Sequence, residues 1–415
     1  MVRLKGFQKL TSVDHALDAF MKAIPAKKPE TASVALPSAL GRVLAENVVA
    51  DEDLPRFDKS AVDGYAVRAK DTVGASQFRP RMFKIVRDGK DRNQAAQVWT
   101  GNPISEGADA VVMLENTKRT GEEIEVWVPL TPGENVSKKG EDVQKGKTAV
   151  EAGVRLKPQH LALIAALGKT EVKVFERPRI AVLATGNELV RIGHERQPSQ
   201  IFDTNRLMIS SLCIELGAEL LDLGIAKDDL AEIAGRLKEG LRKADVIITT
   251  GGTSVGVADL VPEAANKVGR PGLVVHGVAM RPGMPTALAV VDGKPVLILS
   301  GNPVAAFVGF EAFGRPLISG LLGLKQTEPR PTVKAKLTGK ATGALGRKTF
   351  VRVRVFEDRD DLLAEPVSSK GSGIISTMTK GNGFVVVPEN REGLAEGETV
   401  SVSLFDGIEV ARKNV

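Results

Sequence analysis

Glycines, hydroxyls and a carboxylate follow a short apolar run in the segment ADVIITTGGTSVGVADL, which spans residues 244–260. The run Val246–Ile248 is β-branched, which is typical of a buried strand. The glycines after it let the backbone turn tightly and present bare N–H groups to a ligand. A helix expected to begin near Ala258 to Asp259 would direct its positive end to the same place, as in phosphate sites of α/β proteins. The residues predicted to contribute are Gly251, Gly252, Ser254, Gly256 and Asp259.

Three more loops leave expected strands in the same region: Thr185–Glu188, Lys227–Asp229 and Ser300–Pro303. In an open parallel sheet such loops meet outside the carboxyl ends of the strands. Their backbone amides suit phosphate oxygens, and the carboxylates of Glu188 and Asp228 suit Mg²⁺ or hydroxyl and amino donors. Each loop alone is about as consistent with a purely structural turn, but four together predict a site for a phosphorylated polar heterocycle or nucleotide. The spacing fits neither a Walker loop nor a dinucleotide fingerprint.

A second polar cluster lies in residues 57–66, where Asp63-Gly64 stands beside Tyr65, the single tyrosine of the chain. Asp63-Gly64 alone is consistent with an ordinary turn. Residues 99–103 and 139–142 form further polar loops nearby in sequence. These loops favour a functional region without identifying its chemistry.

Strands and helices alternate after Arg177, which predicts a mostly parallel sheet with helices on both faces. The expected strands are 180–184, 220–225 and 246–249, the expected helices are 205–216 and 230–241, and a hairpin is expected from 287–291 and 295–299. Asn302 and Pro303 are typical of the first residues of one more, apolar helix.

The flanking segments have other patterns. Period-two alternation at 333–337, 351–355 and 400–404 predicts antiparallel strands and a small C-terminal β domain. The first fifty residues look helical, with Thr11 or Ser12 as a helix cap, and short β-like runs such as 110–114 and 124–128 follow. We therefore predict an α/β multidomain protein: a discontinuous helical linking domain (1–52 and 148–176), a β-rich insert (53–147), an α/β domain (177–328) and a C-terminal β domain (329–415).

Composition limits the functional classes. The net charge is +6 with both signs interspersed, and aromatic residues make up 4% of the 415 residues, which disfavours a nucleic-acid binder. No uninterrupted apolar run reaches the ~18 residues of a membrane span, and the N-terminus lacks a signal-peptide pattern, so we expect a cytoplasmic protein. The single cysteine, Cys213, excludes an internal disulfide and a cysteine-cluster metal site.

Seven motifs occur in an order that resembles the MoeA family, whose relatives include the E domain of gephyrin. They are FDKSAVDGYAVR, TGNPISEGADAVVMLE, GEDVQKG, ATGNEL, IFDTNR, GGTSVGVADL and LSGNPVAA. The resemblance extends over essentially the whole chain, including the C-terminal β segment.

The resemblance implies a Mg²⁺-dependent molybdopterin molybdenumtransferase that ligates molybdate into adenylylated molybdopterin and releases AMP. It also implies a homodimer, an α/β domain similar to the adenylyltransferase MogA, and a cleft between that domain and the insert of the other subunit. A MogA-like adenylyltransferase and molybdoenzyme apoproteins are the implied protein partners. Matched motif by motif, the implied catalytic residues are Asp63, Thr100, Asp142, Glu188 and Asp228, with Asp259 as the metal ligand. The implied ligand-binding residues are Thr185, Gly186, Gly251, Gly252, Ser254, Gly256, Arg281, Ser300, Gly301, Asn302, Pro303, Arg352 and Ser372.

The chain departs from the family pattern at the expected oxyanion site. Arg281 and Met284 stand where the family motif usually has two lysines, and Ser300 replaces a proline. Arg281 keeps a cation with a fork for oxyanions, whereas Met284 removes one. An alternative is therefore a molybdopterin-binding carrier or scaffold without insertase activity. A MogA-like adenylyltransferase is disfavoured by the matching terminal segments.

Overall fold

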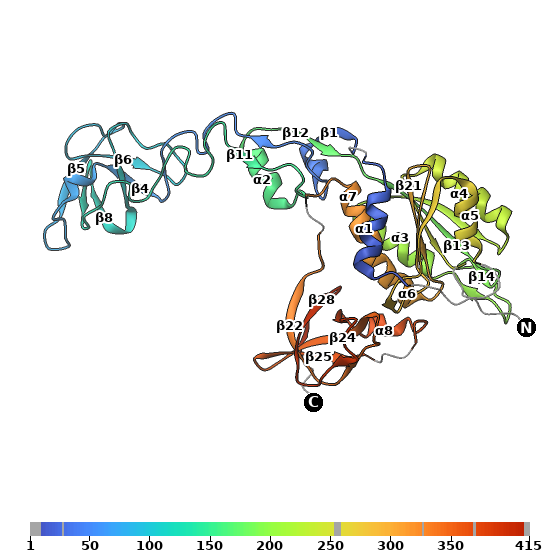
Figure 1. Ribbon diagram of the computed structural model, residues 1–415. Helices are drawn as coiled ribbons and strands as arrows, with labels where there is room; N and C mark the ends of the chain where they lie inside the picture. The colour runs from blue at the N-terminus through green and yellow to red at the C-terminus, as the bar shows by residue number, and fades with distance from the viewer. Residues whose placement is uncertain (1–9, 27–28, 253–258, 326–327, 368–370, 411–415) are drawn as a thin grey trace, which may run out of the picture. The chain divides into compact units, whose positions relative to one another are not determined.

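The structure is a computed structural model that describes residues 10–26, 29–252, 259–325, 328–367 and 371–410 (Figure 1). The chain divides into two compact units. The main unit comprises Met1–Ala32 and Phe175–Val415, and the insert unit comprises Ser33–Val174. The predicted motif residues Ser254 and Gly256 lie outside the described residues.

A six-stranded mixed sheet forms the centre of the main unit. Its order is β16 (Glu219–Ala226), β13 (Arg179–Thr185), β17 (Val246–Thr250), β21 (Lys294–Leu299), β20 (Ala287–Val291) and β18 (Pro271–His276). The first four strands pair in parallel, and the pairings of β21 with β20 and of β20 with β18 are antiparallel. This arrangement confirms the predicted mostly parallel sheet and its hairpin.

Helices cover both faces of this sheet (Figure 1). On one face lie α4 (Leu230–Lys243) and α5 (Leu260–Val268), which pack against each other. On the other lie α1 (Val13–Ala23), α3 (Asn205–Glu215) and the continuous helical run of α6 (Pro303–Gly309), η4 (Phe310–Gly314) and α7 (Arg315–Leu321). Two short parallel strands, β14 (Leu189–Val190) and β15 (Ile201–Phe202), lie between β13 and α3 in sequence.

Local sequence signals explain where the helices on the first face begin. Asp229 caps α4, and its Oδ1 accepts a hydrogen bond from the Glu232 N–H at 2.8 Å. Ile233 and Leu237, four residues apart on one side of α4, are buried in the core beneath it. Asp259 is the N-cap residue of α5, as the motif predicted.

The C-terminal strands close on themselves as a small barrel. The strands β24 (Lys348–Asp358), β25 (Asp361–Pro366), β22 (Thr332–Leu337), β28 (Thr399–Leu404) and β26 (Gly383–Val387) pair in that order, and β26 pairs back with β24. The apolar residues of the period-two pattern fill its interior, which confirms that prediction. Smaller elements here are β23 (Ala341–Thr342), β27 (Gly393–Leu394), β29 (Glu409–Val410) and α8 (Ser376–Thr379).

One strand of the barrel sheet comes from elsewhere in the chain. The strand β19 (Met280–Arg281) follows β18 and pairs in parallel with the start of β24. The pairs are Met280 with Lys348 and Arg281 with Thr349. The barrel is therefore joined through its backbone to the α/β part of the main unit.

The insert unit has two larger hydrophobic cores and a smaller cluster around Ala66, Val98 and Val111. One lies on a six-stranded sheet in the order β7 (Ala110–Met113), β4 (Gly64–Val67), β6 (Gln94–Val98), β5 (Arg81–Ile85), β9 (Glu123–Val126) and β8 (Thr117–Thr120). The other gathers α2 (Pro158–Ala166), η1 (Leu36–Ala39) and the paired β2 (Val48–Val49) and β11 (Thr148–Val150). The unit also contains η2 (Ala69–Thr72), η3 (Leu114–Asn116) and the pair β3 (Lys59–Ser60) and β10 (Val136–Ser137).

The helical prediction for the first fifty residues is correct only for α1. Ser12 caps this helix by accepting a hydrogen bond from the His15 N–H at 3.4 Å. Beyond it, Thr31–Ala35 is the strand β1, which is followed by η1 and β2, so the prediction is wrong there. Pro37 suits the first turn of the short η1, and the β-branched Val48 and Val49 favour a strand. The strand β12 (Glu171–Phe175) is the last element before Arg177.

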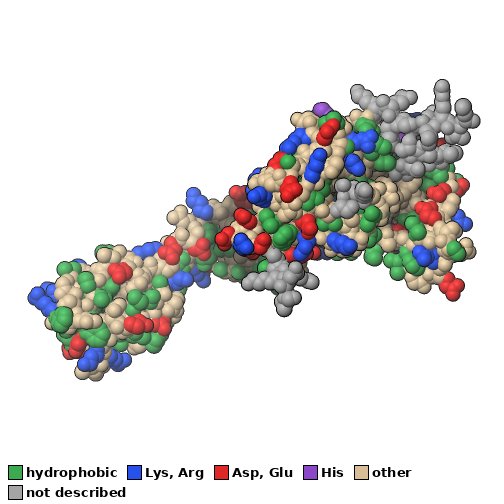
Figure 2. Space-filling view, turned by 90° about the horizontal axis from the view of Figure 1, so that it is seen from below, with side chains coloured by type: hydrophobic (Ala, Val, Ile, Leu, Met, Phe, Trp, Pro, Cys, Tyr) green, Lys and Arg blue, Asp and Glu red, His purple; other side chains and the backbone are tan. Residues whose placement is uncertain are grey.

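The helical run Pro303–Leu321 meets the length and apolarity of a membrane span, but 72% of it is buried inside the protein. Such burial is typical of a core helix. This helical run contains Glu311 and Arg315, which interrupt the apolar sequence. On the surface seen in Figure 2, basic and acidic side chains are interspersed.

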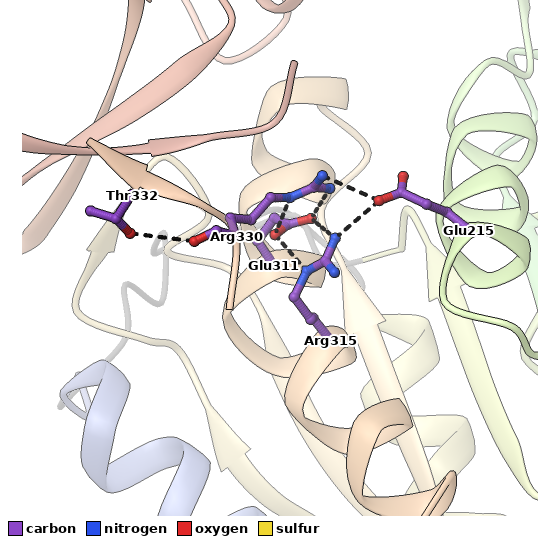
Figure 3. Close-up of polar contacts among 5 residues, drawn as sticks. All are labelled: Glu215, Glu311, Arg315, Arg330 and Thr332. Carbon is purple, nitrogen blue, oxygen red and sulfur yellow. Dashed lines mark hydrogen bonds and ion pairs between the residues drawn. The ribbon is translucent and has the colours of Figure 1, made fainter. Parts of the chain in front are cut away.

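A buried ionic cluster holds this helical run to the chain that enters the barrel (Figure 3). The Glu311 carboxylate accepts hydrogen bonds from Arg315 Nε at 2.9 Å and from Arg330 Nη2 at 2.8 Å. Arg330 Nη1 also lies 3.2 Å from Glu215 Oε1 on α3. Burial alone would raise the pKa of Glu311, but the hydrogen bonds from Arg330 and Arg315 lower it below its ordinary value. Glu311 is therefore charged in the folded protein.

We expect Glu311→Gln to lower the free energy of unfolding by about 3–5 kcal/mol at neutral pH, because two buried guanidinium groups lose their counter-charge. The folded-state pKa of Glu311 is lowered, so its stabilisation is present above the unfolded pKa and lost as the pH falls through the folded value. The difference between wild type and variant in thermal unfolding should therefore shrink as the pH falls below the ordinary pKa of a glutamate, about 4.3, toward the lower folded-state pKa.

A matched control is Glu263→Gln, which breaks an ion pair with Lys267 in which both side chains are more than half exposed. It should cost less than about 1 kcal/mol. The difference in thermal stability between wild type and Glu311→Gln is the quantity to follow with pH. If it stayed constant from neutral pH to about pH 3, this account of the cluster would be wrong.

Candidate functional site

The four predicted loops meet at the carboxyl ends of the parallel strands. The Asn187 N–H donates to Asp228 Oδ2 and the Asp228 N–H donates to Asn187 Oδ1, both at 3.2 Å, which joins two of the loops. Gly251 lies against the Thr185 carbonyl oxygen so closely that a Cβ there would sit 2.3 Å from it. With φ of +91°, this position requires glycine for both reasons. The Gly251 Cα would in turn lie 3.6 Å from a Cβ on Gly301.

Two cavities open beside these loops, both within the main unit. The first, here called the arginine cavity, has a volume of about 330 Å³. The second, here called the threonine cavity, has a volume of about 320 Å³. Of the predicted site residues, the arginine cavity is lined by Arg281, Ser300, Asn302, Arg352 and Ser372, and the threonine cavity by Thr185, Glu188, Gly251, Gly301 and Pro303.

Residues 300–303, here called the ridge, separate the two cavities. Ser300 and Asn302 line the arginine cavity, whereas Gly301 and Pro303 line the threonine cavity. Residues that line one cavity therefore alternate along the ridge with residues that line the other. The residue after the ridge, Val304, donates its N–H to the Ser372 carbonyl oxygen at 3.0 Å, so the segment around Ser372 lies along the ridge.

The arginine cavity combines three guanidinium groups with hydroxyl groups. Arg281 comes from β19, and Arg347 and Arg352 come from the start of the barrel sheet. None of the described residues that line this cavity is an aspartate or glutamate. Arg352 is only 3% exposed; its Nε donates to Thr377 Oγ1 at 3.2 Å, and burial lowers the pKa of its guanidinium. An oxyanion would gain charge-assisted, bidentate hydrogen bonds here.

Sequence reasoning did not identify Arg347 as a lining residue, whereas Met284 lines the cavity together with Arg281. Arg347 precedes β24 in a turn, and it enters the cavity because β24 pairs with β19, which no local pattern in the sequence reveals. Met284 lines the cavity, so its apolar side chain occupies the wall where the family pattern has a second lysine. Arg347 is therefore a third cation in the lining, and it lies outside the motifs quoted above.

The threonine cavity is a mixed polar and apolar pocket. Its apolar wall consists of Leu189, Ile201, Phe202 and Ile375. Its polar side includes the exposed Glu188 and the buried residues Thr185, Thr250 and Asn205. A concave, largely apolar wall with a few polar groups is typical of sites for small organic ligands.

Asp259 lies on α5 next to the segment that the structure does not describe. Its Oδ2 is 3.5 Å from His276 Nε2, and its Oδ1 is buried without a hydrogen-bond partner among the described residues. Burial raises the pKa of Asp259, an effect that His276 opposes. Among the described residues, no group of three or more His, Cys, Asp or Glu side chains gathers as a metal cage.

The other predicted carboxylates belong to the insert unit. Asp63 Oδ1 accepts hydrogen bonds from the Thr100 N–H at 2.8 Å and from Thr100 Oγ1 at 2.7 Å, so these two predicted residues are brought together. Both hydrogen bonds lower the pKa of Asp63 below its ordinary value. Asp142 is exposed, its N–H donates to the Leu54 carbonyl oxygen at 3.1 Å, and no hydrogen bond joins its side chain to Asp63 or Thr100 in the described structure.

Two of the predicted site residues must be glycine because a Cβ would collide with neighbouring atoms. A Cβ on Gly186 would lie 2.8 Å from the Glu188 carboxylate oxygens, and one on Gly252 would lie 2.9 Å from Thr185 Oγ1 and 2.5 Å from Val261. Both glycines therefore let the loops fold closely around Thr185 and Glu188.

Comparison with known proteins extends along almost the whole chain. It matches the MoeA N-terminal region (domain I and II) over residues 11–168, a probable molybdopterin binding domain over 181–320, and the MoeA C-terminal region (domain IV) over 334–405. A molybdopterin molybdenumtransferase of Bacillus subtilis is 38% identical over 392 residues, 91% of each chain. A putative molybdopterin biosynthesis protein of Methanocaldococcus jannaschii is 34% identical, covering 98% of this chain and 100% of the relative. The crystal structure of a molybdopterin biosynthesis MoeA protein from Pyrococcus horikoshii matches with a TM-score of 0.82 and 31% identity over 96% of this chain and 100% of that one. The chain therefore belongs to the MoeA family.

Proposed function

We propose that this protein is a molybdopterin molybdenumtransferase, which ligates molybdate into adenylylated molybdopterin and releases AMP. The observation that carries the proposal is the pair of cavities on the two sides of the ridge. One cavity is built for a small dianion and the other for a heterocycle, and residues 300–303 contribute to both walls. Two reactants held on either side of four residues have lost most of their freedom to diffuse apart, which is a large part of the work of a ligase.

Molybdate fits the arginine cavity by charge. Arg281, Arg347 and Arg352 supply fixed guanidinium donors, and Ser300 and Ser372 add hydroxyls. Because the described lining residues carry no carboxylate, they do not repel the anion. The third arginine offsets the cation that is absent at Met284, and this favours the insertase over the carrier alternative.

The pterin nucleotide fits the threonine cavity and the loops around it. The apolar wall would cover the flat ring, and Glu188 with the backbone of Gly251 and Gly301 would face its polar edges. The phosphates would lie toward the glycine-rich segment that ends at Asp259, where Ser254 and Gly256 are further expected ligands.

Asp259 is suited to supply one of the ligands of a Mg²⁺ ion. Its Oδ1 has no hydrogen-bond partner among the described residues, and Mg²⁺ commonly takes one or two carboxylates while phosphates and water complete its shell. When bound, the ion would supply positive charge that polarises the phosphoanhydride. The described residues form no cage of several carboxylates, which agrees with a cation that arrives with the nucleotide rather than one held permanently.

The proposed reaction balances as two exchanges. Water adds to the phosphoanhydride, the bond between one phosphorus and the bridging oxygen breaks, and AMP leaves while a phosphate monoester remains on the pterin. At molybdenum, the two dithiolene sulfurs replace an oxo ligand, which departs with the two thiol protons as water. Asp63, Thr100, Asp142, Glu188 and Asp228 are the candidates that orient the ligand or the attacking water. We propose, as the family resemblance implies, that the protein works as a homodimer that receives its substrate from a MogA-like adenylyltransferase and passes its product to molybdoenzyme apoproteins.

Incubating the protein with adenylylated molybdopterin and Mg²⁺ over a range of molybdate concentrations tests this function. Chromatography should show AMP release that rises with molybdate and saturates. Tight pterin binding with no molybdate-dependent AMP would contradict the insertase and support the carrier. In the same assay, Arg352→Ala should raise the half-saturating molybdate concentration about 10- to 100-fold, because a hydrogen-bonded charge is lost from a buried site.

Arg354→Ala is the matched control for that variant. Arg354 lies two residues along the same strand but pairs with Glu409 at 2.9 Å and with Glu365 at 3.5 Å instead of lining the cavity. Its molybdate dependence should match that of wild type. Equal effects of the two substitutions would show that the arginine cavity does not bind molybdate.

A separate prediction concerns the insert unit. Asp63→Ala should reduce AMP release by at least about 100-fold with unchanged thermal unfolding, whereas Asp88→Ala at an exposed site of the same unit should have no effect. Because the hydrogen bonds from Thr100 lower the pKa of Asp63, activity should persist to acidic pH and fall only as Asp63 becomes protonated. Thr100→Val removes the hydroxyl donor but keeps the N–H, so the acidic limb of the pH profile should move to higher pH. An unchanged limb would remove Asp63 from the catalytic step.

A further inference from the structure

The buried hydroxyl group of Thr377 is hydrogen-bonded to an arginine of the arginine cavity. Arg352 Nε donates to Thr377 Oγ1 at 3.2 Å, and the two residues are 3% and 4% exposed. Arg352 lies on β24, whereas Thr377 lies on α8, in the segment that follows Ser372. The bond therefore joins the strand that carries Arg352 to the segment that carries Ser372, and both of these residues line the cavity.

A second hydrogen bond fixes the direction of the first. Thr377 Oγ1 lies 2.7 Å from the Ile374 carbonyl oxygen, which only accepts, so the single proton of the hydroxyl is donated there. Toward Arg352 the hydroxyl can therefore act only as an acceptor. A guanidinium group has donors and no acceptor, so the two side chains match. A valine of the same shape would leave the Arg352 Nε–H facing a methyl group.

This contact restrains the guanidinium group of Arg352. The group is planar, so a hydrogen bond to Nε limits the rotations that would move its two terminal nitrogens. With Nε bonded to Thr377, an oxyanion that binds in the bidentate manner meets those terminal nitrogens. An arginine held in this way loses less conformational freedom when it binds an anion than an unrestrained one does.

The segment that carries Thr377 lies against the ridge. The Ser372 carbonyl oxygen accepts a hydrogen bond from the residue after the ridge, and a Cβ on Gly373 would lie 3.5 Å from Asn302 Oδ1. The Thr377 hydroxyl therefore relates Arg352 to the other walls of the arginine cavity as well as to its own strand.

We propose that Thr377 is a positioning residue, whose hydroxyl group orients the Arg352 guanidinium group for binding of the metal oxyanion. The inference rests on the proposed function, which places molybdate in the arginine cavity. Thr377 is not among the described residues that line the cavity, so it acts through Arg352. Its removal should weaken molybdate binding without slowing the reaction at saturating molybdate, and it should have no effect when Arg352 is absent.

The experiment measures molybdate-dependent AMP release and, independently, molybdate binding by calorimetry, both with the full-length protein. Thr377→Val should raise the half-saturating molybdate concentration and the Kd about 3- to 10-fold, while the rate at saturation stays within about twofold of wild type. Thr377→Ser keeps the hydroxyl and should restore both values. Added to Arg352→Ala, Thr377→Val should change the Kd by less than about twofold, because the two residues act as a unit.

Thr379→Val is the matched control. Thr379 lies on the same short helix, and its hydroxyl also donates to a carbonyl oxygen three residues back, that of Ser376 at 3.1 Å. It is exposed and bonds to no arginine in the described part of the chain, so its molybdate dependence should match that of wild type. Thr377→Ala, which removes the acceptor and leaves room beside Nε, takes the place of Thr377→Val if the latter does not fold.

Two outcomes would overturn the inference alone: unchanged molybdate affinity in Thr377→Val and Thr377→Ala, or a loss of the same size in the presence and absence of Arg352. Failure of wild type to bind molybdate, or to release AMP in response to it, would instead contradict the proposed function. A loss of molybdate affinity that Thr377→Ser restores, and that disappears in the Arg352→Ala background, supports the assignment of Thr377.

Discussion

The strands β19 and β24 run side by side over only two residue pairs, and the composition of the arginine cavity depends on that short contact. Arg281 and Ser300 come from the α/β part of the main unit, whereas Arg347, Arg352 and Ser372 come from the barrel segment. The Lys348 N–H donates to the Ala279 carbonyl oxygen at 2.9 Å, and Lys348 Nζ lies 2.8 Å from Asp14 Oδ1 on α1, so the junction has both backbone and side-chain contacts. The Glu311 cluster holds the incoming chain at Arg330. Without these contacts the cationic groups would remain on separate sheets.

Gathering three guanidinium groups around one cavity costs free energy, because like charges repel and burial removes water from them. Burial lowers the pKa of Arg352, because removing water from its guanidinium group disfavours the charged form. Neighbouring carboxylates commonly neutralise such groups in proteins, as Glu311 does for Arg315 and Arg330. No aspartate or glutamate is among the described residues that line the arginine cavity. The described lining of this cavity therefore carries a net positive charge, which suits an anionic ligand.

Local patterns predicted much of this architecture. β-Branched runs, period-two alternation and caps such as Ser12 and Asp229 correspond to the observed strands and helix starts, and the loops after β13, β16, β17 and β21 meet as expected. The residues that no local pattern revealed all depend on long-range contacts. Arg347 reaches its cavity through the pairing of β19 with β24, and Thr377 bonds to Arg352, which lies 25 positions away in the chain. Residues 31–49 do not form the helix that we predicted, because the short strands there pair with strands elsewhere in the chain.

The central claim is that the arginine cavity holds the metal oxyanion next to the pterin, with the ridge between them. The most direct test is X-ray diffraction at the molybdenum absorption edge from crystals of the protein soaked in molybdate. The account predicts an anomalous peak within hydrogen-bonding reach of Arg281, Arg352 and Ser300. A fully occupied molybdenum peak elsewhere, with none in the arginine cavity, would contradict it.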